Sequence, residues 1–184
     1  MSNHDPIYTQ CMDQFNNTCT TSFLQTLYEW QTAVGSTILA AHTTNTSICQ
    51  ILVRPTGGGN TLVFTSIAAC IKGITLCICP LLILGSDQYE IPVAKTSRKF
   101  SITGFHFYEW SPHEVDNFLL PKLTALSPSH TIIIFTPPQC LLCSFSNVLE
   151  ILVVMKIVCF VVGDEVHLVN YFGQYFRMEF PALR

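Results

Sequence analysis

Charged residues are scarce in this chain. Nine lysines and arginines and twelve aspartates and glutamates make up only 11% of its 184 residues, and the net charge is −3. Nucleic-acid-binding domains characteristically carry a basic patch. The only local basic cluster here is Lys95, Arg98 and Lys99, for which a solvated loop is the default interpretation. We therefore expect any DNA binding by this chain alone to be weak and to be lost as the salt concentration rises.

A hydrophobic run long enough to cross a membrane is also missing, although 49% of the residues are hydrophobic. The best candidate, residues 148–162, is interrupted by Glu150 and Lys156 and is too short to span a bilayer. The polar N-terminus, residues 1–17, contains no apolar core of a secretory signal. The sequence therefore predicts neither membrane insertion nor secretion.

The nine cysteines do not form a complete metal or disulfide pattern. Their number is odd, and several lie in runs expected to be buried strands, where a free thiol behaves as a small apolar group. Cys140 and Cys143 have CxxC spacing, but no second CxxC or histidine pair completes a zinc site. Free cysteines predict a reducing intracellular compartment, which would be the nucleus if the organism is eukaryotic.

Short β-branched runs alternate with helical patterns along the chain. Strands are expected at residues 48–53, 74–79, 131–135 and 157–162, with a short one around 100–107. Helices are expected at residues 22–41 and 61–71, from Ser111 to about Leu126, and over most of 140–155. This alternation predicts an α/β fold with a mainly parallel sheet and helices on both faces. A polar N-terminal segment, residues 1–21, would precede one domain over residues 22–184.

A glycine-rich segment lies between the first expected strand and the helix after it. Residues 54–61 read Arg-Pro-Thr-Gly-Gly-Gly-Asn-Thr, and the three glycines let backbone N–H groups approach an anion at the start of a helix. A phosphate loop has lysine for the β/γ-phosphates and then Ser or Thr for Mg²⁺. Gly59 and Thr61 fit this pattern, but Asn60 replaces the lysine. The alternative is a simple turn, which the strand–loop–helix context disfavours.

Two adjacent carboxylates follow the last expected strand. Asp164 can hold Mg²⁺ through water, and Glu165 can orient and deprotonate an attacking water. The alternative is a strand that reaches the surface in an acidic turn. The order and spacing of the two motifs favour a nucleotide site at the carboxyl ends of parallel strands.

Together these motifs resemble the first RecA-like lobe of RecQ-type superfamily-2 DNA helicases, from about Leu27 to the end of the chain. The resemblance implies a three-layer RecA-like P-loop fold that is incomplete at its C-terminus, with ATP and Mg²⁺ as cofactors. Gln31 matches the family's adenine-reading glutamine, and adenine stacking would come from Tyr28. The phosphate-binding residues that the resemblance implies are Pro55, Thr56, Gly57, Gly58, Gly59, Asn60 and Thr61, and the implied Mg²⁺ ligands are Thr61 and Asp164.

The resemblance extends to DNA contacts and to catalysis. Residues 80–88 are similar to a motif that touches the DNA backbone, and residues 136–139 to a Thr/Ser-Pro-Glu turn with glutamine in place of the acid. Residues 164–167 match the Asp-Glu-x-His box, which implies catalytic roles for Glu165 and His167. Residues 170–177 resemble the aromatic-rich loop that couples DNA contact to hydrolysis, with phenylalanine in place of a tryptophan at position 172 and Gln-Tyr in place of His-Asp at 174–175. The DNA contacts that these motifs imply are Pro80, Leu81, Asp87, Gln88, Phe172, Phe176 and Arg177.

Whether the chain hydrolyses ATP stays undecided at this point. The family's motor needs a second lobe, and the sequence stops at Arg184, a few residues after the aromatic loop, so we expect a fragment, a truncated gene model or a degenerate copy. The hypothesis that we adopt is the ATP-binding lobe of a RecQ-like DNA helicase, with the second lobe in the same or another chain. The alternatives are a catalytically inactive nucleotide- or nucleic-acid-binding module and a different P-loop or α/β protein, and the aromatic loop disfavours the latter.

Overall fold

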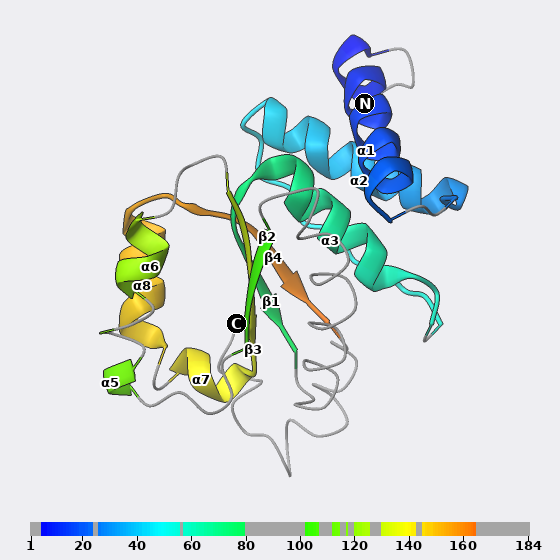
Figure 1. Ribbon diagram of the computed structural model, residues 1–184. Helices are drawn as coiled ribbons and strands as arrows, with labels where there is room; N and C mark the ends of the chain where they lie inside the picture. Colours follow the sequence, from blue (N-terminus) through cyan, green and yellow to red (C-terminus); the bar gives the residue numbers. More distant parts are fainter. Residues whose placement is uncertain are drawn as a thin grey trace.

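A computed structural model describes residues 5–23, 26–55, 57–79, 102–106, 112–114, 117, 120–125, 130–142 and 145–164. The helices and strands follow one another along the chain as shown in Figure 1. In chain order they are α1 (Pro6–Phe23), α2 (Glu29–Thr43), α3 (Asn60–Ile71), β1 (Gly73–Ile78), β2 (Ile102–His106), α5 (Pro112–Glu114), α6 (Leu120–Ala125), β3 (Thr131–Thr136), α7 (Pro138–Leu142), α8 (Ser146–Val154) and β4 (Val158–Gly163).

The four described strands form one parallel sheet in the order β2-β3-β1-β4. All residues of β3 and the inner residues of β1 are buried, as expected for strands that are covered on both faces. A β-bulge between Ile74 and Thr75 shifts the register of β1 against β4. The α/β fold with a parallel sheet is therefore confirmed, as are the strands predicted at residues 74–79, 131–135, 157–162 and around 100–107.

Helices cover both faces of the sheet (Figure 1). On one face α3 packs its Phe64 and Ala68 against β1 and β3, and the Phe64 and Phe135 rings meet edge to face with their centroids 6.4 Å apart. On the other face α6, α7 and α8 bury Leu123, Leu141 and Leu152, among others, against the same two strands. The result is a three-layer arrangement.

The two N-terminal helices pack together on α3. A buried cluster joins the three helices, and its members are Cys11, Phe15, Cys19, Leu39, Ala40, Val63 and Ile67. Gly35 lets α1 approach α2 closely, because a Cβ at this position would overlap the Phe15 ring. Helix α1 thus occupies most of the segment predicted to be polar, residues 1–21, and its apolar side contributes to the core.

The single helix predicted over residues 22–41 is wrong, because α1 ends at Phe23 and α2 begins only at Glu29. Tyr28 has the extended backbone angles φ −73° and ψ 151°, and its N–H donates to Oε1 of Gln31 at 2.8 Å. A glutamine at the third helical position that caps the backbone in this way marks a helix start. The predicted helix over 140–155 is likewise two helices, α7 and α8, with Phe145 in a turn between them.

The strand predicted at residues 48–53 is also wrong. These residues have no regular secondary structure, and Ile51 and Val53 are 89% and 86% exposed. Extended backbone becomes a strand only when a neighbouring strand satisfies its N–H and C=O groups, and the strands that the structure describes pair with one another instead. β4 ends the described sheet, and its Val161 is 55% exposed.

In the described ranges, no helix is both long enough and apolar enough to cross a membrane. The eight described cysteines are all free thiols. The reducing compartment stays a prediction.

Candidate phosphate-binding site

The glycine-rich loop is folded as a tight turn in front of α3. Gly57 and Gly59 have φ angles of 79° and 87°, which is left-handed backbone that other residues adopt only at a cost. The N–H of Gly58 donates to the carbonyl of Pro55 at 3.0 Å, and a Cβ on Gly58 would lie 3.0 Å from that same oxygen. Two of the three glycines are therefore required by backbone conformation and the third by a close backbone approach.

Gly59 connects the loop to α2 as well as to α3. It is the N-cap residue of α3, and its carbonyl accepts a bond from the Nε2 of Gln31 at 3.3 Å. A Cβ on Gly59 would lie only 2.6 Å from that Nε2, so no larger residue allows this contact. The first N–H groups of a helix have no partner within the helix, and at α3 they face the loop. Free N–H groups at a helix start favour anions, and phosphate binding at this loop stays a prediction.

Gln31 is almost completely buried, with 2% of its surface exposed. Its Oε1 accepts from the Tyr28 N–H and its Nε2 donates to Gly59, so one side chain holds the start of α2 against the start of α3. An amide carries two N–H groups and two lone pairs, so one donor and one acceptor remain for another partner. The adenine-reading role of Gln31 stays a prediction, and the structure adds a positioning role.

Asn60 is the first residue of α3, where a phosphate loop usually has lysine. Its Oδ1 is buried without a hydrogen-bond partner among the described atoms. A buried acceptor without a partner costs free energy. The side chain provides no positive charge at the position where the usual lysine would contact phosphate.

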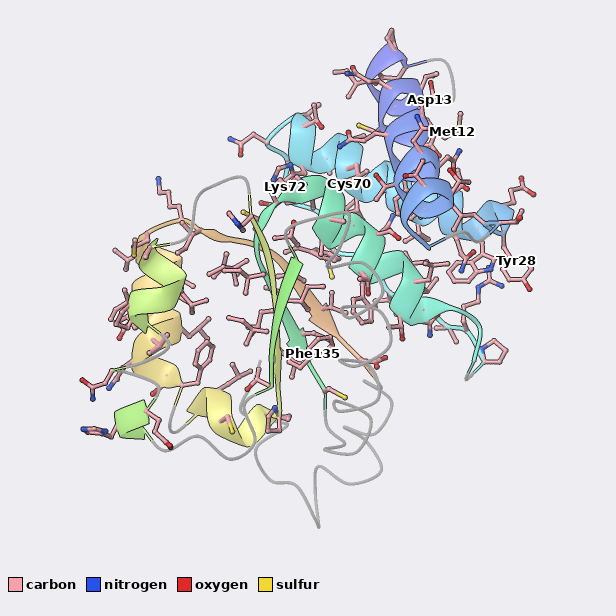
Figure 2. The ribbon with its side chains drawn as sticks, in the orientation of Figure 1. Met12, Asp13, Tyr28, Cys70, Lys72 and Phe135 are labelled. Carbon is pink, nitrogen blue, oxygen red and sulfur yellow. The ribbon has the colours of Figure 1, made fainter. Side chains whose placement is uncertain are left out.

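Two aromatic residues lie at the start of α2, near the loop. Tyr28, the predicted stacking residue, is 67% exposed, and Figure 2 shows it on the side of the molecule where α3 begins, whereas Cys70 and Lys72 lie at the other end of α3. Trp30 is partly buried against the helical cluster, and the Arg54 guanidinium carbon lies 4.7 Å from its ring centroid. Sequence reasoning missed this pair because no local pattern relates residues that are 24 positions apart.

Asp164 lies at the carboxyl end of the sheet. It follows β4, and its N–H donates to the carbonyl of Ile78, the last residue of β1, at 2.9 Å. The last turn of α3 leads into the start of β1, so the first turn of α3 lies toward the carboxyl ends of the strands (Figure 1). In the described ranges, no group of three His, Cys, Asp or Glu side chains could hold a metal ion. The Mg²⁺ roles of Thr61 and Asp164 stay predictions.

Several predicted site residues fall outside the described ranges. They are Thr56, Pro80, Leu81, Asp87, Gln88, Glu165, His167, Phe172, Phe176 and Arg177. Of the predicted site, the structure brings together Gln31 and the glycine-rich loop. The adenine, phosphate and DNA contacts stay predictions.

Comparison with known proteins relates the chain to helicases. It is 27% identical over 135 residues to the ATP-dependent DNA helicase Q5 of Rattus norvegicus and, with the same identity and length, to the one of Mus musculus. The match covers 70% of this chain but only 13% of each relative. No protein-family model matches the chain. The chain is thus a distant relative of a RecQ-like helicase, which agrees with its α/β fold.

Proposed function

We propose that the chain is an ATP-binding lobe of RecQ-helicase descent that holds nucleotide without turning it over alone. The observation that carries this proposal is the hydrogen bond between Gln31 and Gly59, because it connects the segment proposed to read adenine with the loop proposed to bind phosphate. The relation to ATP-dependent DNA helicases supports the same ligand. Without that relation, the loop would indicate an anion site of unspecified ligand.

The residues of the loop fit a phosphate group but not the full catalytic set. The left-handed backbone at Gly57 and Gly59 and the start of α3 present N–H groups, and a side chain at Gly57 would meet no atom within 4 Å, so the loop is open there. Thr61 and Asp164 would hold Mg²⁺, which supplies charge neutralisation to the phosphates. Asn60 cannot stabilise a transferring phosphoryl group as lysine does. We therefore expect binding without measurable hydrolysis, with or without DNA.

Single-stranded DNA is the partner that the aromatic loop would contact, through Phe172, Phe176 and Arg177. The test is fluorescence anisotropy of a labelled single strand with the chain and its Phe172→Ala/Phe176→Ala variant at increasing salt. Stacking contributes about 1–3 kcal/mol per base, so the double variant should bind at least tenfold more weakly. Equal binding of both proteins would exclude this contact.

Nucleotide binding is tested with a fluorescent ATP analogue on the unchanged chain and on Asn60→Lys. A charge-assisted hydrogen bond contributes about 1.5–3 kcal/mol, so the lysine should tighten binding by about ten- to a hundredfold. Asn147→Lys is the matched control, because it makes the same substitution at an exposed position on α8, across the sheet from α3. If both variants bind alike, or if the unchanged chain binds no ATP, the proposed site is wrong.

A further inference from the structure

Lysine and arginine are almost absent from the N-terminal part of the sequence, which contains the loop. Arg54 is the only lysine or arginine in residues 1–71 of the sequence. The next basic residue, Lys72, lies at the opposite end of α3 (Figure 2). The only lysine or arginine in this stretch of sequence therefore directly precedes Pro55 and the glycines, in a loop whose usual lysine is replaced by Asn60.

Arg54 is held beside the loop by contacts on two sides. Its Cβ lies 3.7 Å from the position that a Cβ on Gly58 would occupy, so the base of the side chain adjoins the middle glycine. Its guanidinium lies over the ring of Trp30. Trp30 in turn precedes Gln31, whose amide bonds to Gly59. The loop and the platform under the guanidinium are thus parts of one connected unit.

Among the described residues, the guanidinium of Arg54 has an aromatic partner but no anionic one. In the described part of the chain, no carboxylate lies within ion-pair distance of Arg54, and the side chain is exposed. Contact with an aromatic ring uses the face of a guanidinium and leaves the N–H groups at its rim available. Those N–H groups match phosphate oxygens in geometry, and they do so better than an ammonium group.

We propose that Arg54 is the phosphate-binding cation of this site and that it replaces the loop lysine lost at Asn60. The inference rests on the proposed function, because it takes the nucleotide at the loop as given. Arg54 provides charge from the N-terminal side of the loop, whereas the usual lysine provides it from the helix side. Such a cation supports binding, and it does not restore the group that would stabilise the transferring phosphoryl.

The competing explanation is that Arg54 only packs on Trp30 and holds the loop against α2. The two explanations differ in which part of the nucleotide is affected by the residue. Loss of a phosphate contact would weaken the binding of ATP but not of adenosine, whereas loss of a packing contact would weaken the binding of both.

The experiment compares the affinities of ATP and adenosine for the unchanged chain, Arg54→Gln, Asn60→Lys and the double variant by calorimetry. We expect Arg54→Gln to weaken ATP binding by about ten- to a hundredfold and adenosine binding by less than about twofold. Asn60→Lys should restore ATP binding in the Arg54→Gln background. Lys156→Gln is the matched control, since it removes one positive charge from an exposed residue at the end of α8 and should leave ATP affinity unchanged.

Three results would overturn the inference. If Arg54→Gln weakens ATP and adenosine equally, Arg54 acts through packing. If Lys156→Gln lowers ATP affinity as much as Arg54→Gln, the effect is one of net charge. If the unchanged chain binds ATP and Arg54→Gln binds it equally well, Arg54 has no part in binding and the proposed nucleotide site still stands. Absence of ATP binding by the unchanged chain would instead remove the proposed function and this inference together.

Discussion

Gly59 should be much less replaceable than Gly57, although both glycines have similar backbone angles. With φ near 80–90°, alanine costs about 1–2 kcal/mol at either position. At Gly57 nothing lies within 4 Å of an added Cβ, so the backbone strain is the whole loss in the free energy of unfolding. At Gly59 the Cβ displaces the Gln31 amide, and an unsatisfied buried amide costs about 1–3 kcal/mol more.

The assay is thermal and urea unfolding of Gly57→Ala and Gly59→Ala, each alone and in a Gln31→Ala background. A difference of about 1–3 kcal/mol corresponds to a melting temperature lower by roughly 2–12 °C for Gly59→Ala in a domain of this size. In the Gln31→Ala background the two alanine variants should differ by less than about 0.5 kcal/mol, since the displaced group is gone. Equal costs in the unchanged background would refute the Gln31–Gly59 contact.

Three further predictions concern the core, the pH dependence and the sheet edge. In an exposed helix, Gly→Ala raises the free energy of unfolding by about 1 kcal/mol. Gly35→Ala should instead lower it by about 1–3 kcal/mol, measured by urea unfolding, because the added methyl group overlaps the Phe15 ring. A higher free energy of unfolding would contradict the α1–α2 packing. Burial raises the pKa of the Cys19 thiol from 9.0 to about 11, so the folded state holds this proton more tightly than the unfolded state. The contribution of this thiol to stability is therefore fully present below pH 9 and is lost as the pH rises towards 11. Unfolding free energies measured from pH 8 to 11 should show a smaller loss for Cys19→Ala than for the unchanged chain. Val161→Lys should reduce self-association on size-exclusion chromatography, because a charge on an edge strand blocks pairing with other chains. Val153→Lys on α8 is the control, since Val153 is equally exposed at 55% and should have no such effect. Equal effects of the two substitutions would mean that self-association depends on surface hydrophobicity in general.

Most of the sheet could be predicted because its strands carry their own signal. β1, β3 and β4 are short runs rich in β-branched residues. β1 and β3 are buried on both faces, and such runs have this composition wherever they pair. Residues 48–53 carry the same local signal and form no strand. Propensity alone cannot distinguish the two cases, because pairing depends on a neighbour that is distant in sequence.

The phosphate loop was predictable because its function requires particular backbone angles. The pattern indicates a glycine turn followed by a helix. The structure has left-handed backbone at Gly57 and Gly59 and a helix that begins at Asn60. The contacts that hold the loop were not predictable. Gln31 was predicted to read adenine, and the structure shows that both ends of its amide already bond to backbone. Arg54 was predicted as part of the loop sequence, with no role of its own.

These contacts explain how the loop keeps its shape without a strand behind it. In a parallel α/β sheet the strand that leads into such a loop is normally fixed by ladder hydrogen bonds on both sides. Here the preceding residues have no regular secondary structure and are exposed, so the sheet does not position the loop. Helix α2 does so instead, through the Gln31 bond to Gly59 and the Trp30 contact with Arg54. The helix that carries the segment predicted to read adenine therefore also supports the glycine-rich loop, and a substitution that disturbs one should alter the other.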